Sequence, residues 1–318
     1  MSTDTGAPIT LSPDDAFSLL GNETRIEILR ALGEADRPLS FTELRDQVGI
    51  RQGGQFNYHL DKLVGHFVRK NEEGYSLRRS SSRVIKAVLS GAVTEDPTIE
   101  PTQIDVPCTY CEAPVEVTYA QEMLEYYCTE CEGAYRWKDR ESTIEGKPGH
   151  LGGAPLPPAG VIGRSPEEAH QAAMSWGHLQ IMGRAAGTCP ACSAALEQWW
   201  TVCEEHKTED DICPTCEQRF ATQYHTRCTN CIEAGDSIFV NGLIANTEVL
   251  AFLSRHGINF LEPISNQWAA FDFEEEVRST DPIQVRFTLT VDDDTLTLQV
   301  DERPDGFELR TISDTSGN

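Results

Sequence analysis

Cysteines arranged in pairs are the residues of this chain with the clearest chemistry. Eleven cysteines occur in 318 residues, and ten of them stand in Cys-x-x-Cys pairs. The sequence has no charged leader and no apolar run of about 18 residues or more, so we expect a soluble cytoplasmic protein whose thiols stay reduced. Paired thiols in that compartment are typical of metal ligands rather than of disulfides.

The first group of cysteines has the spacing of a zinc ribbon. Its two pairs are separated by sixteen residues with alternating apolar positions, which predicts a β-hairpin between two metal-binding turns. Four thiolates complete the tetrahedral shell that Zn²⁺ prefers, so we expect a structural ion without an open position for a substrate. The four ligands are Cys108, Cys111, Cys128 and Cys131.

A second, denser group offers eight ligands and predicts two further ions, which makes about three zinc ions per chain. Two pairings stay open: ligands taken in sequence order give two successive ribbons, and alternating pairs give a cross-brace similar to that of RING domains. The acidic run at residues 209–211 resembles a linker and favours the sequential pairing. The eight candidates are Cys189, Cys192, Cys203, His206, Cys213, Cys216, Cys228 and Cys231.

No arrangement typical of catalysis accompanies these ligands. The sequence has no nucleophile elbow, phosphate loop, His-Glu-x-x-His helix or deaminase-type His-x-Glu motif. His170 and His178 would share one face of a helix that begins after Ser165, but no third ligand joins them, so we expect no metal there. We therefore expect that the protein is not an enzyme.

Residues 40–79 predict a helix, a turn, a second helix and a β-hairpin, in the order of a winged helix-turn-helix. An apolar stripe of Phe56, Leu60 and Leu63 predicts the core-facing side of the second helix. Gly53 and Gly54 would let a phosphate approach the start of that helix. The opposite side carries amides, a phenol and a cation, which suit base edges and phosphates. The predicted groove contacts are Arg51, Gln52, Gln55, Asn57, Tyr58 and Lys62, and the predicted phosphate contacts from the hairpin are Arg69, Lys70 and Arg78.

The charge distribution suits DNA contact in this segment alone. The chain carries 51 acidic and 26 basic residues, a formal net charge of −25. Residues 51–90 nevertheless hold eight basic and three acidic side chains, a local excess of +5, which favours a polyanionic partner. Only six of the basic residues are lysine, and acid excess with scarce lysine is similar to the composition of halophilic proteins. An acidic partner-binding surface is the competing explanation.

The N-terminal sequence resembles the ArsR-type winged-helix transcription regulators over residues 12–92. The resemblance rests on the runs LLGNETRIEILRAL, FTELRDQVGI and FNYHLDKL. It implies a dimer that reads two half-sites of double-stranded DNA, with the hairpin wing resting on the backbone. Metal-sensing members carry cysteines on the helix before the recognition helix, and this chain has none there. Zinc ribbons followed by an acidic C-terminal module are similar to haloarchaeal proteins of this regulator type.

We therefore expect an α+β protein built from successive modules. The expected modules are a winged helix-turn-helix at residues 10–92, a zinc ribbon at 104–138, a Gly/Pro-rich linker without regular structure at 139–165, a helix with the two-zinc module at 166–234, and an acidic module with a helix and two or three antiparallel strands at 235–318.

Capping residues and helical periodicity predict where the helices begin and which sides they bury. The expected N-caps are Ser12, Asn22, Ser40, Ser165 and Asn246. The expected inward positions are Ile26, Leu29 and Leu32 in a second helix that ends at Gly33, and Ala169, Ala173 and Trp176 in the helix after Ser165. A helix expected at residues 81–92 has one apolar side, and we interpret this side equally well as a dimerisation surface or as a surface that packs within the subunit.

Taken together, these patterns favour a sequence-specific DNA-binding transcription regulator with structural zinc. We expect double-stranded DNA and a second copy of the chain as partners, the transcription machinery as a further candidate, and no membrane. One alternative is a zinc-ribbon adaptor that binds the transcription machinery. A second alternative is a redox- or metal-responsive sensor in which the site of Cys203 and His206 is labile.

Overall fold

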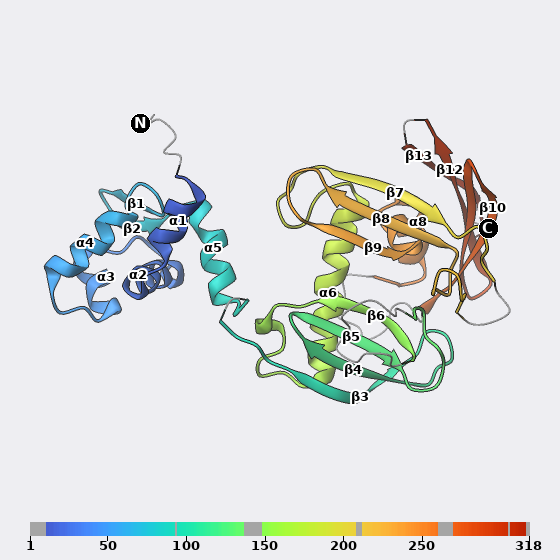
Figure 1. Ribbon diagram of the computed structural model, residues 1–318, viewed down its shortest axis with the longest axis horizontal. Helices are drawn as coiled ribbons and strands as arrows, with labels where there is room; N and C mark the ends of the chain where they lie inside the picture. The colour runs from blue at the N-terminus through green and yellow to red at the C-terminus, as the bar shows by residue number, and fades with distance from the viewer. Residues whose placement is uncertain are drawn as a thin grey trace. The chain divides into compact units, whose positions relative to one another are not determined.

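The computed structural model describes residues 11–92, 94–136, 148–207, 212–259, 270–304 and 306–315. The chain divides into two compact units, Met1–Glu95 and Asp96–Asn318. Helices dominate the first unit and antiparallel sheets dominate the second (Figure 1), so the fold is mixed α+β, as expected. Among the described residues, no helix combines the length and the apolar character needed to cross a membrane.

Capping side chains set the starts of the first three helices in the first unit. Ser12, Asn22 and Ser40 each accept a backbone hydrogen bond as N-caps, and Ser40 forms a capping box with Glu43, so these predicted helix starts are confirmed. The elements of this unit are α1 (Pro13–Leu20), α2 (Glu23–Glu34), α3 (Phe41–Val48), α4 (Gly53–Leu63), the antiparallel strands β1 (Val68–Asn71) and β2 (Gly74–Leu77), and α5 (Arg79–Leu89).

The core of the first unit forms around α4. Phe56, Leu60 and Leu63 are fully buried, as the apolar stripe predicted. The Phe41 ring of α3 meets the Phe56 ring edge-on, with 5.1 Å between the ring centroids. These contacts fix one side of α4 against the other elements of the unit.

Two expectations for α2 are wrong. Ile28 is fully buried whereas Ile26 is only half-buried, because α2 also packs against β2 and α5. The helix continues past Gly33 to Glu34, so Gly33 does not end it. A Cβ at Gly33 would lie 3.3 Å from Cγ2 of Ile85, which shows that this glycine permits close packing against α5.

The described part of the second unit contains three antiparallel sheets, in the strand orders β3-β4-β5-β6, β7-β8-β9 and β10-β11-β12-β13. The strands are β3 (Ile99–Pro107), β4 (Pro114–Ala120), β5 (Met123–Cys128), β6 (His150–Pro155), β7 (Leu196–Val202), β8 (Thr222–Cys228), β9 (Ala234–Ile238), β10 (Asp272–Thr280), β11 (Ile283–Val291), β12 (Asp294–Arg303) and β13 (Gly306–Asp314). The helical segments are η1 (Pro158–Gly160), α6 (Pro166–Ala185), α7 (Val240–Leu243) and α8 (Thr247–Arg255).

The segment expected to be a linker contributes a strand to the first sheet, so that expectation is wrong. β6 pairs with β5 in antiparallel register, and η1 follows it. Gly152 has φ +144°, and a Cβ there would lie 2.9 Å from the hydroxyl of Tyr126. The glycines therefore mark a closely packed edge strand. Residues 139–147 of the expected linker lie outside the described residues.

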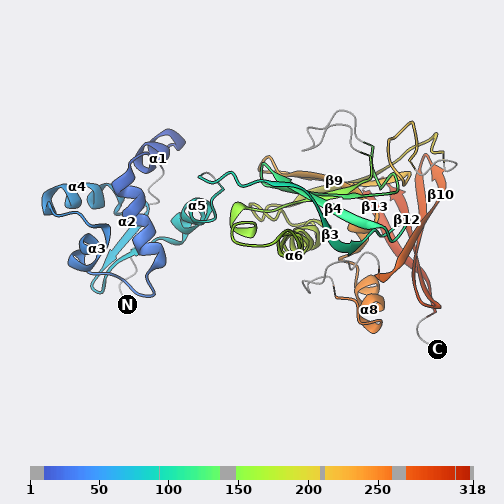
Figure 2. The same cartoon turned by 90° about the horizontal axis from the view of Figure 1, so that it is seen from below.

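The long helix α6 packs against the first sheet (Figures 1 and 2). It also packs against α7. Ser165 caps it in a capping box with Glu168, as predicted. Ala169 and Ala173 are buried as expected, but Trp176 is 45 % exposed, which corrects its predicted inward position. Apolar side chains occur all round this helix, so helical periodicity does not identify its buried face.

The C-terminal module has four strands where two or three were expected. The alternation along β11 and β12 buries Phe287 opposite Leu298, as a half-buried sheet requires. The additional strand β10 carries Glu274, Glu275 and Glu276 in succession, and this acidic run hides the apolar alternation by which strands are recognised.

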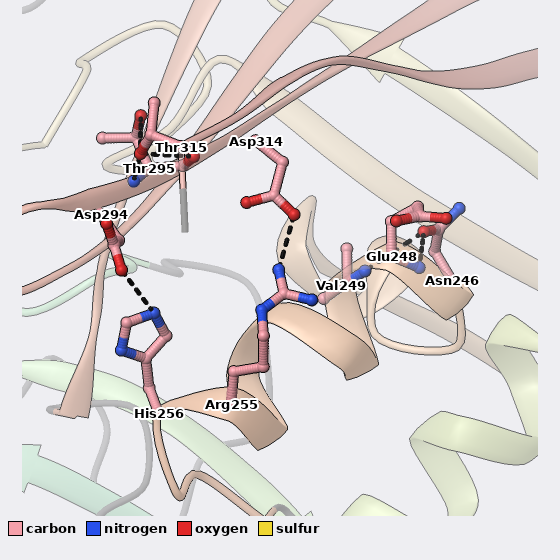
Figure 3. A network of polar contacts seen from close by, with 9 residues as sticks. All are labelled: Asn246, Glu248, Val249, Arg255, His256, Asp294, Thr295, Asp314 and Thr315. Atoms are coloured by element: carbon pink, nitrogen blue, oxygen red, sulfur yellow. Dashed lines mark hydrogen bonds and ion pairs between the residues drawn. The ribbon is translucent and has the colours of Figure 1, made fainter. Parts of the chain in front are cut away.

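Polar contacts fasten α8 to the turns and ends of this sheet (Figure 3). Asn246 caps the start of α8, as predicted. At the other end of the helix, Nη2 of Arg255 lies 2.6 Å from Oδ2 of Asp314, and Nε2 of His256 lies 3.4 Å from Oδ2 of Asp294. The C-terminal end of the helix is thereby tied to the sheet, while its buried residues Val249, Phe252 and Leu253 join the same core as the sheet.

Replacing Phe287 tests the core of the second unit. Its ring stacks on Phe239 with centroids 4.3 Å apart, so Phe287→Ala should lower the free energy of unfolding by about 3–5 kcal/mol through lost burial and the resulting cavity. Urea denaturation followed by tryptophan fluorescence, at fixed salt and zinc, measures this change. Val277→Ala, at a position 37 % exposed, is the control, and an equal loss in both variants would contradict the assigned core.

Candidate metal centres and nucleic-acid interface

The β4–β5 hairpin brings the first cysteine group together. Val115 pairs with Cys128, so both Cys-x-x-Cys pairs meet at the same end of the hairpin. Sγ of Cys108 lies 3.7 Å from Sγ of Cys131, and Sγ of Cys111 lies 3.4 Å from Sγ of Cys128. Four sulfurs about 2.3 Å from a zinc ion form a tetrahedron with edges of about 3.8 Å, so this spacing suits one metal ion.

The second cysteine group forms two ligand sets in a nested order. Within each set, the ligand atoms all lie within 4.8 Å of one another. Both the sequential pairing and the cross-brace are therefore wrong, although every predicted ligand belongs to a set of four. The outer set is Cys189, Cys192, Cys228 and Cys231, and the inner set is Cys203, His206, Cys213 and Cys216.

Strand pairing explains the nesting. β7 and β8 are antiparallel, with Leu196 opposite Cys228 at one end and Val202 opposite Thr222 at the other. The pair before β7 therefore meets the pair after β8, and the two pairs between the strands meet each other. The acidic run at residues 209–211, which favoured a linker, lies outside the described residues.

The same backbone turn recurs in three of the Cys-x-x-Cys pairs. In each, the N–H of the first cysteine donates to the carbonyl five residues ahead, and its carbonyl accepts the N–H four residues ahead. That fourth residue has a positive φ, 62° at Glu112, 64° at Ser193 and 57° at Glu217. The turn holds both sulfurs of a pair near one ion. Sequence reasoning missed these three residues, whose signal is their position directly after each pair.

The thiols of one set cannot all ionise together without a cation between them. In the inner set, hydrogen bonds from the backbone of Cys216 and Lys207 outweigh the opposing effect of burial and lower the pKa of Cys213 to about 6. Burial raises the pKa of the Cys216 thiol in the same set to about 12. A metal cation would displace the remaining protons, so these sets have the chemistry of metal sites.

His206 presents Nδ1 to the inner set, 3.4 Å from Sγ of Cys216. Burial lowers the pKa of His206, against the opposing effect of a backbone hydrogen bond with Arg219. A neutral imidazole with one nitrogen toward the thiolates and a backbone partner is suited to bind a metal ion. The inner set therefore offers three sulfurs and one nitrogen.

Arg219 joins the inner set to the turn that follows the first cysteine group. Its backbone N–H donates to the carbonyl of Ala134 over 2.9 Å, and Nε donates to the carbonyl of Gly133 over 2.8 Å. Its guanidinium carbon lies 4.3 Å from the centroid of the Tyr110 ring. Two turns that carry candidate metal ligands, far apart in the sequence, are thus fixed side by side.

All nine residues predicted to contact DNA are exposed in the first unit. Nζ of Lys62 lies 5.8 Å from the centroid of the Tyr58 ring, so these two side chains share one patch. The amide of Asn57 donates to Asp61 over 2.7 Å, and Arg78 donates to the carbonyl of Gly65. The nine residues are Arg51 and Gln52 before α4, Gln55, Asn57, Tyr58 and Lys62 on α4, Arg69 and Lys70 on β1, and Arg78 after β2.

The start of α4 is open to an anion. Gln52 makes no side-chain cap hydrogen bond, so it does not cover the first backbone N–H groups of the helix. No atom would lie within 4 Å of a Cβ added at Gly53 or Gly54. The geometry leaves room for a phosphate at this helix terminus.

Comparison with known proteins identifies the family. A family model described as Domain of unknown function (DUF7351) matches residues 105–305, which is more than half of the chain, so the chain belongs to that family. The match spans all three ligand sets. A model described as Domain of unknown function (DUF7347) matches residues 13–88, within the first unit. No curated protein and no solved structure matches the chain.

Single ligand substitutions will test the nested pairing. After exchange of bound metal for cadmium, we expect three ¹¹³Cd resonances, two from four-sulfur sites and one from the site with a nitrogen ligand. Cys192→Ser and Cys231→Ser should remove the same four-sulfur resonance, whereas Cys216→Ser should remove the one with nitrogen. Cys111→Ser is the control and should affect neither. Loss of one common resonance in Cys192→Ser and Cys203→Ser would contradict the nesting.

Proposed function

We propose that this chain is a sequence-specific DNA-binding transcription regulator whose first unit acts as a winged helix-turn-helix of the ArsR type. The two-sidedness of α4 carries the proposal. One side buries Phe56, Leu60 and Leu63, while Tyr58 is 61 % exposed and Lys62 lies beside it. A helix held by a core on one side, with amide, phenol and ammonium groups on the other, is suited to the major groove.

The β1–β2 hairpin supports the proposal as the wing. Arg69 and Lys70 are exposed and adjacent on β1, where they would meet phosphates. Tyr75 of β2 exchanges two backbone hydrogen bonds with Leu39, at 2.8 and 2.9 Å, which ties the hairpin to the segment before α3. A hairpin anchored in this way would present its cations at a fixed distance from α4.

A second copy of the chain is part of the proposal. On α5, Ile85 is 3 % exposed and belongs to the core of the first unit, whereas the adjacent Val84 is 37 % exposed. One side of α5 therefore packs within its own subunit, and another side exposes an apolar residue that a second copy could contact. In the ArsR-type arrangement, two copies would read two half-sites of one duplex.

We assign zinc to the three ligand sets and a structural role to each ion. Cysteine thiolates with one imidazole are ligands that zinc favours, and four protein ligands fill its tetrahedral shell. A closed shell leaves no position for a substrate, so the ions would stabilise the second unit.

Substitutions on α4 test the DNA interface. Tyr58→Ala and Lys62→Ala should each weaken binding to a duplex selected from a random pool by about 1–3 kcal/mol, because each removes a direct contact. Gel shift in molar KCl measures the loss, since concentrated salt suppresses nonspecific phosphate binding.

Arg30→Ala is the matched control because it removes an exposed cation of the same unit, one that pairs with Glu34 on α2. Its binding should equal that of the unaltered protein. Unchanged binding in both α4 variants would refute the assigned face. A protein that shows no preference for any duplex over competitor would refute the regulator itself.

A further inference from the structure

A cavity of about 1000 Å³ lies within the second unit, between the first sheet, α6 and the segment around β9. Small residues make room for it. Gly152 and Ala154 of β6 and Ala173 and Gly177 of α6 contribute to its wall, and a Cβ at Gly177 would come within 3.4 Å of the Cβ of Ala154. The volume is at the upper end of the range typical of small-molecule sites. None of the twelve ligand residues is among the described residues that line it.

Three buried polar atoms among the lining residues have no hydrogen-bond partner in the described part of the chain. They are Nδ1 of His170, Oδ1 of Asn241 and Nε of Arg184. His170 is only 3 % exposed. Buried polar atoms are nearly always hydrogen-bonded in folded proteins, so three such atoms around one cavity indicate a missing partner inside it.

These atoms define what the partner must offer. Burial, with a smaller effect of the neighbouring His178, lowers the pKa of His170 to about 4, so its imidazole is neutral near pH 7. A neutral imidazole and an amide oxygen accept or exchange hydrogen bonds, and Nε of Arg184 donates one. The occupant therefore needs at least one donor and one acceptor.

The charged side chains of the wall already have polar partners. Arg184 pairs with Glu233, and Asp236 lies 2.6 Å from Nδ1 of His225. Glu125 accepts a hydrogen bond from the hydroxyl of Tyr127 over 2.8 Å. Arg184 is the only lysine or arginine among the described lining residues and is already paired, so an anion would find no free cation there, and a neutral occupant avoids the cost of burying a charge.

Aromatic rings determine the shape of the occupant. The rings of Tyr126 and His170 meet edge-on with centroids 6.0 Å apart, and Phe273 also lines the cavity. Ring faces and edges of this kind pack well against another flat ring. We propose that the cavity binds an uncharged, planar heteroaromatic molecule, held by His170, Asn241 and Arg184. The second unit alone carries this site, which does not depend on DNA binding by the first.

Benzimidazole is the probe for this site because it is planar, uncharged near pH 7.5 and carries one donor and one acceptor. Titration calorimetry with the full-length, zinc-replete protein should show saturable binding of one molecule per chain. His170→Phe and Asn241→Leu, which keep much of the side-chain volume, should each reduce the affinity about fivefold to tenfold through loss of a hydrogen bond. Leu179→Ala, at a position of α6 that is 54 % exposed, is the control and should bind as the unaltered protein does.

The ¹⁵N resonances of the His170 imidazole in the unaltered protein give a second measurement that does not rely on variants. They should shift on addition of benzimidazole, and they should shift less with indole, which lacks the acceptor nitrogen. Zinc content measured for each variant identifies any that has lost its fold. Absence of saturable binding, or equal affinities in all variants with unmoved His170 resonances, would mean that the cavity holds water only and would overturn the proposal.

Discussion

Two sets of four metal-ligand residues, one at each end of the β7–β8 pair, are the constraint on which the arrangement of the second unit depends. Each set needs two turns at fixed separation, so the register with Leu196 opposite Cys228 and the nested ligand order require each other. One-residue slippage would move every side chain of a strand to the other face and would separate the turns. The ligand sets can therefore hold this short sheet in one register, although few of its residues are fully buried.

That register orients the rest of the unit. Trp200 of β7 and Tyr224 of β8 pair across the strands and face the C-terminal core, where the Trp200 ring lies 5.5 Å from that of Phe287. At the inner set, Arg219 reaches the turn after the first cysteine group. The turns that carry the ligand pairs thus help to position the sheets of this unit. The cavity lies beside α6, where Ala173 and Gly177 contribute small side chains to its wall.

Features fixed by neighbours in the sequence could be predicted. Each expected N-cap makes its hydrogen bond with a residue two or three positions ahead, and the buried stripe of α4 repeats within three turns. The twelve ligands were recognisable because each pair lies within four residues. Their pairing was not, since it depends on which strands meet and in which register, which the spacing of the ligands does not show.

Other misses have the same origin in distant contacts. The role of Gly33 depends on α5, because the residue that packs closely against this glycine is Ile85, more than fifty positions later in the sequence. The glycine-rich composition around Gly152 predicts a linker, yet Gly152 pairs with Tyr126 of β5 as part of a strand. The polar atoms around the cavity come from α6 and from Asn241, and no local sequence pattern predicts that these residues lie around one cavity. Nucleic-acid contact is different, because it rests on an exposed surface whose partner lies outside the chain, so it stays a prediction.

The main interactions that stabilise this fold do not weaken as the ionic strength rises. Metal–thiolate bonds, as proposed for the three ligand sets, and stacked rings such as Phe239 on Phe287 are not screened by salt, whereas exposed ion pairs such as Arg30 with Glu34 are. The net charge of −25 makes the surface repel itself, and salt reduces that repulsion. Concentrated salt would therefore remove a destabilising term and leave the ligand sets and aromatic core intact. Concentrated salt also weakens contacts with phosphates. The DNA-binding face proposed on α4 would therefore depend on hydrogen bonds and ring contacts, which Tyr58 and its neighbours can make.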